Sequence, residues 1–144
     1  MFLTAREWTI FLVIGLVVAA GCARSPEAKK ARHLERGDRY FSRQQYRDAA
    51  IQYRNVLQLE GMNAHAIRQL GLAHYRLGEL GHALRYLPRS QALEPDDLGV
   101  RLKLATIYLL TRQPEKARAQ AAFVLEKEPK NQGALHTVRR HHAV

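Results

Sequence analysis

The sequence predicts an all-α solenoid of three helix–turn–helix repeats, preceded by a signal or anchor helix. Small residues recur at an interval of 34, in one series of Gly37, Gly71 and Ala105 and another of Ala49, Ala83 and Ala117. The three copies close at the same interval on Gly61, Pro95 and Pro129. A fixed period of roughly 20–50 residues is typical of stacked-repeat proteins, and 34 is typical of a two-helix unit. We therefore expect a protein that holds other molecules.

The N-terminal stretch is typical of an export signal. An uncharged apolar run extends from Ile10 to Ala20 and is preceded by Arg6. A run of this length fits the apolar region of a signal peptide, roughly 7–15 residues, whereas a spanning helix needs about 20. Residues 1–21 are therefore predicted to be a signal peptide, and a permanent anchor helix is the alternative.

The single cysteine lies where the apolar run ends. The stretch from Val18 to Cys22 resembles the lipobox of bacterial lipoprotein precursors. That resemblance implies cleavage before Cys22 and a lipid on its thiol. Because Ala23 stands where an Asp would imply retention at the inner membrane, the resemblance implies an outer-membrane protein facing the periplasm. The alternative is an inner-membrane protein held by an uncleaved helix.

Three repeats are predicted over residues 30–63, 64–97 and 98–131, after a tether at residues 22–29. Pro26 favours a tether because a proline biases the residue before it away from helix. The expected helices are 30–43 and 46–59, 64–77 and 80–93, and 98–111 and 114–127. Residues 132–144 begin like a fourth copy and stop before a second helix, so we expect a partial repeat or a capping helix.

The sequence from Leu70 to Tyr75, followed by Ala83 and Pro95, resembles the tetratricopeptide repeat (TPR) family, and the resemblance extends over residues 30–131. In that family a small residue on the first helix meets a small residue on the second, which lets the two backbones approach closely. The resemblance implies that Gly37 meets Ala49 and that the later repeats pair likewise, as Gly71 with Ala83 and Ala105 with Ala117. Pro88 falls inside a predicted helix, where we expect a bend or break.

The first helix of each pair is expected to line a concave binding face. The residues predicted to face a protein partner there are Asp38, Phe41, His65, Arg68, Leu72, Tyr75, Arg76, Thr106 and Leu109. Arg68 and Arg76 could hold a carboxylate or a sulfate, or could be ordinary solvated residues. The carboxylate-clamp members of the family carry Lys and Asn where this chain has Leu34 and Asp38, so chaperone-tail binding is not expected.

The chain has a net charge of +10, with the basic excess in the first and third repeats and balanced charges in the second. Such a surface could attract anionic lipid or polysaccharide, or could simply keep the solenoid soluble. Neither a glycine-rich phosphate loop nor zinc spacing nor a catalytic triad is found in the sequence, so we expect no enzyme, cofactor or metal site.

The expected function is that of a lipid-anchored scaffold that binds a protein partner at the bacterial envelope, as an accessory to envelope assembly or polysaccharide export. The alternative is a protein that binds an anionic polymer, either exopolysaccharide or lipid headgroups, through its basic surface. Nucleic acid is not among the favoured partners.

Overall fold

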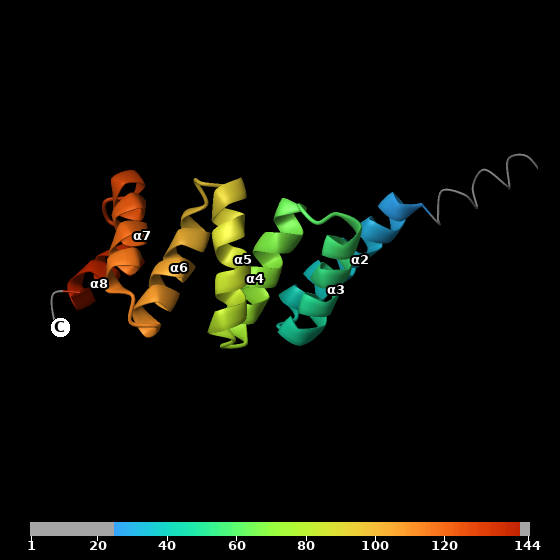
Figure 1. Cartoon of the computed structure of the whole chain (residues 1–144), viewed down its shortest axis with the longest axis horizontal. Coiled ribbons are helices and arrows are strands. Elements are labelled where there is room, and N and C mark those ends of the chain that lie inside the picture. The colour runs from blue at the N-terminus through green and yellow to red at the C-terminus, as the bar shows by residue number, and fades with distance from the viewer. Residues whose placement is uncertain (1–24, 142–144) are drawn as a thin grey trace, which may run out of the picture.

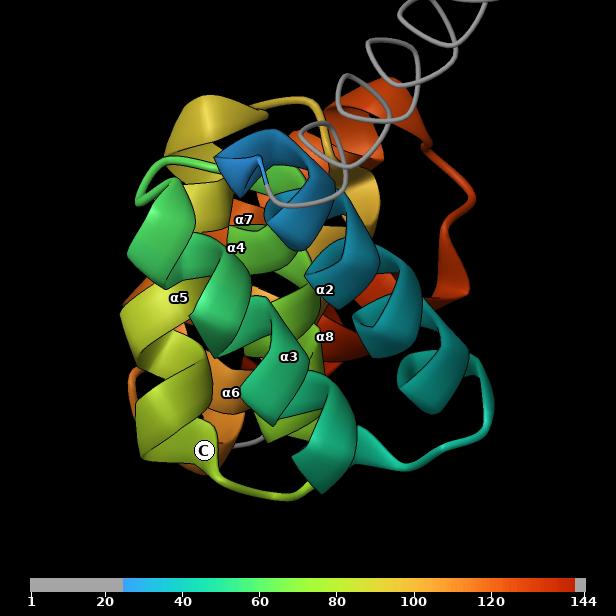
Figure 2. The same ribbon diagram turned by 90° about the vertical axis from the view of Figure 1, so that its right-hand side faces the viewer.

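The computed structural model describes residues 25–141, which form seven consecutive helices. They are α2 (Pro26–Ser42), α3 (Tyr46–Leu59), α4 (Ala64–Arg76), α5 (Leu80–Leu93), α6 (Leu98–Leu110), α7 (Pro114–Lys127) and α8 (Gln132–His141). The helices stack as antiparallel pairs in an elongated array, with α2 and α3 at one end and α7 and α8 at the other (Figure 1). Figure 2 shows the same array from the end where α2 and α3 lie. The predicted all-α repeat fold is confirmed.

The first helix begins at Pro26, four residues earlier than predicted, so the last four residues of the expected tether are helical. The Ser25 side chain caps this helix by accepting a hydrogen bond from the Ala28 N–H at 3.1 Å. Pro26 takes the first helical position, where a missing N–H carries no cost. The prediction for residues 26–29 was wrong because proline was interpreted there as a breaker.

The hydrophobic core divides into three clusters, and each lies between the second helix of one repeat and the first helix of the next. The first cluster joins α3 to α4 through residues that include Tyr53 and Leu70. The second joins α5 to α6 through Leu87 and Leu104, and the third joins α7 to α8. Each repeat therefore depends on its neighbour for stability, and α8 covers the exposed end of the third repeat.

All six small residues predicted to permit close packing are buried. The nearest contacts of the two glycines, however, are not the predicted alanines. A Cβ on Gly37 would meet the Tyr53 ring at 2.7 Å, and one on Gly71 would meet Leu87 at 2.7 Å. Both contact residues lie one helical turn beyond the expected alanine. The first helix therefore carries glycine where the second helix inserts a large side chain.

The same capping signal starts the first helix of each later repeat. The side-chain oxygens of Asn63, Asp97 and Asn131 accept hydrogen bonds from the backbone N–H three residues later, at 2.9, 2.9 and 3.1 Å. These residues are 34 apart. Asn and Asp are among the residues preferred at this position because they satisfy one of the free N–H groups of the first turn.

The turn within each repeat contains one residue in the left-handed region. Its φ is 61° at Gln44, 74° at Gly78 and 55° at Arg112, again at intervals of 34. The residue after each of them donates its N–H to a carbonyl near the end of the preceding helix, as Gln45 does to Tyr40 at 2.9 Å. One backbone conformation therefore links the two helices in all three repeats.

Pro88 lies inside α5, which continues from Leu80 to Leu93 without interruption. Of the bend or break expected at residues 86–89, the break is therefore wrong. Proline at this position cannot donate to the carbonyl one turn earlier, but the core contacts of Leu87 hold the segment in place.

Candidate functional site

The first helices of the repeats form the inner face of the array. α6 contacts both α4 and α8, which places these helices on the shorter side of the curve. The nine residues predicted to face a partner all lie on first helices: two on α2, five on α4 and two on α6. The inner face is therefore the candidate binding site.

Two of the predicted residues bind each other. Asp38 Oδ1 lies 2.7 Å from His65 Nε2 and also accepts a hydrogen bond from the Tyr53 hydroxyl at 2.7 Å. Burial raises the pKa of the Tyr53 hydroxyl, and its hydrogen bond to Asp38 adds to that effect. The Asp38 carboxylate is thus held within the protein and is about half exposed.

Arg68 is also bound within the array. Its Nε donates to Asp97 Oδ2 at 2.6 Å, while the other carboxylate oxygen of Asp97 caps α6. Burial acts to raise the pKa of Asp97, but the Val100 N–H and the Arg68 guanidinium outweigh it and keep that pKa below its ordinary value. Arg68 was predicted to hold an anion with Arg76 or to be solvated, but its ion pair with Asp97 instead connects α4 to the start of α6.

Arg76 differs from Arg68 because its side chain is exposed and makes no ion pair within residues 25–141. Next to it on α4, Tyr75 is half-buried, and Lys103 Nζ lies 5.4 Å from the centre of its ring. The Lys103 ammonium thus lies near the face of the Tyr75 ring, and Arg76 is the next residue on α4. A carboxylate could bind the cationic groups, and an apolar group could pack on the ring.

The remaining predicted residues contribute mostly to packing. Phe41 meets Tyr46 edge-on with ring centres 5.2 Å apart, and Leu72 packs against the second core cluster. The Thr106 hydroxyl donates to the Leu102 carbonyl at 3.0 Å, so its donor is used within α6. Leu109 is half-buried. On α4, Arg76 and Tyr75 are therefore the predicted residues with most capacity left for a ligand.

The comparisons with known proteins agree with the helical repeat fold. Residues 37–78 match the family model described as TPR repeat. U-box domain-containing protein 70 of Oryza sativa subsp. japonica is 28% identical over 108 residues, which are 75% of this chain and 13% of that protein. The chain thus spans a small part of the length of this relative.

Solved structures share the fold at low sequence identity. The Arabidopsis OM64 TPR domain superposes with a TM-score of 0.71 at 18% identity, covering 83% of this chain and 98% of that one. The first TPR of Spaghetti (RPAP3), bound to an HSP90 peptide, gives 0.70 at 22% identity, with 81% and 92% covered. The second TPR domain of human RPAP3, in complex with an HSP70 peptide, gives 0.70 at 18% identity, with 82% and 98% covered. The described chain is a TPR-like helical repeat domain.

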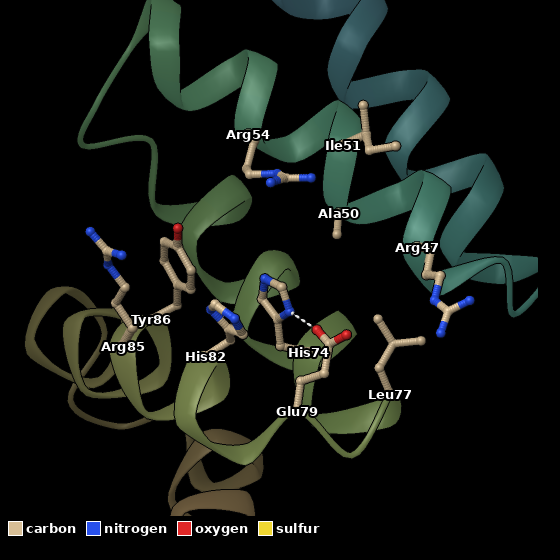
Figure 3. A pocket seen from close by; sticks show the side chains of 10 residues that line it. All are labelled: Arg47, Ala50, Ile51, Arg54, His74, Leu77, Glu79, His82, Arg85 and Tyr86. Atoms are coloured by element: carbon tan, nitrogen blue, oxygen red, sulfur yellow. Dashed lines mark hydrogen bonds and ion pairs between the residues drawn. The ribbon is translucent and has the colours of Figure 1, made fainter.

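Sequence reasoning missed a groove on the outer side of this helical repeat domain. It lies between the second helices α3 and α5, has a volume of about 610 Å³ and is closed at its floor by the end of α4. Its lining residues are Arg47, Ala50, Ile51, Arg54, His74, Leu77, Glu79, His82, Arg85 and Tyr86. Figure 3 shows the α3 residues facing the rings of His74, His82 and Tyr86 across the opening. The signal in the sequence was His74, which replaces the tyrosine found in the other two repeats.

One hydrogen bond holds the floor of the groove. His74 Nδ1 donates to Glu79 Oε2 at 2.6 Å. This hydrogen bond is the chief reason why the pKa of Glu79 lies below its ordinary value, and the nearby charges of His82 and Arg47 add to the effect. The single carboxylate of the groove is therefore already bound.

Several features expected from the sequence lie outside the described residues, among them Cys22 and the signal peptide. Within residues 25–141 the helices are too short or too polar to span a bilayer. The same range holds no group of three side chains suited to a metal ion.

Proposed function

We propose that this TPR domain is a scaffold that binds a protein partner through its inner face. The observation that carries the proposal is the exposed Arg76, which makes no ion pair with any described residue and follows the half-buried Tyr75 on the inner helix α4. The guanidinium can bind a carboxylate of a peptide, and the Tyr75 ring can pack against an apolar group of the same peptide. Two of the similar structures, both RPAP3 domains, hold chaperone peptides, which supports peptide binding in general.

The chaperone tail itself is a poor candidate for the ligand. Asp38 stands where clamp-type members carry an asparagine, and its carboxylate is about half exposed on the inner face. A negative charge there would repel the carboxylates of an acidic C-terminal peptide. We therefore expect a partner with a single acidic group near an apolar one.

A photo-crosslinking amino acid placed at position 109 or at position 118 tests this function. Leu109 lies on the inner helix α6, whereas Arg118 is exposed on α7, a second helix, and serves as the matched control. We expect a defined adduct from position 109 that position 118 does not give, and expect Arg76→Ala and Tyr75→Ala each to reduce it. Equal adducts from both positions, or the same adduct after Arg76→Ala and after Tyr75→Ala at unchanged helicity, would contradict the proposal.

The scaffold is further proposed to be attached by lipid to the bacterial envelope, facing the periplasm, as an accessory to envelope assembly or polysaccharide export. The support is the lipobox-like stretch ending at Cys22. Two or more acyl chains hold a protein on a membrane far more firmly than one. We expect Cys22→Ala to abolish incorporation of labelled fatty acid, and wild-type labelling of that variant would end this part of the proposal.

Binding of an anionic polymer is the second candidate. A shallow hollow of about 230 Å³ is lined by Arg36 and Arg39 of α2 and by Arg43 just after this helix, which favours an anionic ligand. Polyanion binding falls steeply with salt because counterions are released. A loss of binding between low and physiological salt, with no defined crosslink from position 109, would favour this candidate over the protein partner.

A further inference from the structure

The outer groove between α3 and α5 has an unbalanced charge. Arg47 and Arg54 of α3 stand on one wall, and Arg85 of α5 stands on the other. Arg54 and Arg85 make no hydrogen bond or ion pair with any other residue of the described chain. Glu79 is the one acidic lining residue, and His74 already binds it. The groove is therefore suited to a ligand with at least two negative charges.

The floor of the groove is flat and partly apolar. The His74 ring stacks on His82, with ring centres 4.9 Å apart, and on Tyr86, with ring centres 5.8 Å apart. Ile51 lies on the α3 wall and remains 45% exposed, although it is a large apolar side chain. A ligand that fills this groove should therefore carry an apolar group as well as charge, which favours a peptide over a simple anion or a sugar chain.

The two arginines of α3 limit the shape of such a peptide. Arg47 and Arg54 are seven residues apart on one helix, which corresponds to about 10.5 Å along its axis. In a polyproline II helix, residues three apart lie on the same side at about 9 Å. Two glutamates three residues apart in such a segment could each meet one of these arginines, with an apolar side chain between them.

We propose that the outer groove between α3 and α5 binds an acidic, extended peptide segment of a second partner, with two carboxylates three residues apart and an apolar residue between them. The groove lies on the second helices, away from the inner face, so the domain could hold two partners at once. This inference is independent of the ligand on the inner face.

A labelled peptide containing Glu-Pro-Leu-Glu, titrated with the full chain and followed by fluorescence anisotropy, tests the charge requirement. We expect Arg47→Glu with Arg54→Glu to raise the Kd at least tenfold. The matched control is Arg118→Glu with Arg139→Glu, which changes net charge equally at exposed positions on α7 and α8 and should raise the Kd less than threefold. Equal losses in both double variants, or equal binding of the peptide with Gln in place of Glu, would overturn the proposal.

A second pair of variants tests whether the ligand is a peptide. Ile51→Ser should weaken binding by at least threefold, while Leu110→Ser, at a 61% exposed position outside the groove, should not. Binding that depends on the arginines but not on Ile51 would overturn the peptide proposal and indicate a simple anion site. Displacement of the labelled peptide by inorganic phosphate as effectively as by unlabelled peptide would lead to the same conclusion. Arg76→Ala should leave the Kd unchanged, so failure of the inner-face function would be seen separately.

Discussion

A methyl group on Gly71 would lie 2.7 Å from Cδ2 of Leu87 and 3.2 Å from its backbone nitrogen. Leu87 is fully buried, so it has no free space into which to move. The contact explains why the first helix needs glycine there, and it has a counterpart in the third repeat. Ala105 and Ala121 occupy the equivalent positions and are both fully buried, so a larger residue on one helix accompanies a smaller residue on the other.

Gly71→Ala is expected to lower the free energy of unfolding by about 1–3 kcal/mol, because overpacking forces side chains and backbone apart. The control is Gly81→Ala, since an added Cβ there would meet nothing within 4 Å. That change should raise stability by up to about 1 kcal/mol through helix propensity. Urea unfolding of both variants measures the difference, and equal effects would contradict this account of the contact.

Gly71→Ala combined with Leu87→Ala should be less damaging than the sum of the two single changes. Leu87→Ala alone leaves a cavity and should cost about 2–5 kcal/mol. In the double variant the added methyl faces the space that Leu87 vacated, as at Ala105 and Ala121. A double-mutant cycle should therefore give a favourable coupling energy, whereas simple additivity would show that the two residues do not compete for space.

Gln44→Gly and Arg112→Gly should each raise stability slightly, whereas Gly78→Ala should lower it by about 1 kcal/mol. All three residues have positive φ, which costs a residue with a side chain about 1–2 kcal/mol and costs glycine nothing. The gain at Gln44 and Arg112 is reduced because glycine also makes the unfolded chain more flexible. Thermal unfolding measures the change in Tm of each of the three variants, and a lower Tm for Gln44→Gly would contradict the expected gain in stability.

Asp97→Asn should remove a pH-dependent part of the stability and keep the helix cap. Asn caps the equivalent turns at Asn63 and Asn131, so the bond to the Val100 N–H should survive. Because the folded pKa of Asp97 is lowered, its contribution is present above about pH 4 and is lost as the pH falls below that value. The pair is partly solvated, so we expect a difference of about 1 kcal/mol or less at pH 7. Unfolding midpoints of both proteins should converge as the pH falls toward 3, and a constant gap would contradict the assignment.

Ser90→Ala should stabilise the domain by about 1 kcal/mol. The Ser90 hydroxyl is buried, with 1% of the residue exposed, and has no hydrogen-bond partner among the described residues. A buried hydroxyl without a hydrogen-bond partner costs about 1–3 kcal/mol of desolvation free energy, and the alanine methyl group carries no such cost. Ser42→Ala is the control because Ser42 is exposed, and it should change stability by less than about 0.5 kcal/mol. A loss of stability at Ser90 would indicate that the hydroxyl has a partner in solution.

The fold was predictable from the sequence because its signals are local and repeat. The boundaries of α3, α5 and α7 agree with the prediction, since Pro114 and the closing residues mark the helix ends. The start of α2 was missed because a Ser-Pro pair such as Ser25 and Pro26 is also typical of a tether. Local signals could not distinguish a proline at the first helical position from one in a linker.

The candidate site was less predictable because it depends on how the repeats rotate against each other. Arg68 was expected to hold an anion or to be solvated, and its partner Asp97 is 29 residues away, at the start of the first helix of the next repeat. The outer groove was missed for a related reason. Counting charge by repeat showed a balanced second repeat, whereas the groove combines arginines of the first and second repeats on one face.

The left-handed turn residues at positions 44, 78 and 112 have a consequence for how such a domain can change its ligand. The angle between the two helices of each repeat is determined by the backbone conformation of the turn and by contacts of the buried glycine or alanine residues. None of these positions is an exposed residue of the proposed binding surfaces, such as Arg76 or Arg54. Substitutions at the exposed residues should therefore leave the curvature of the array unaltered. Related proteins can therefore differ in the ligands that they bind while the arrangement of their helices stays the same.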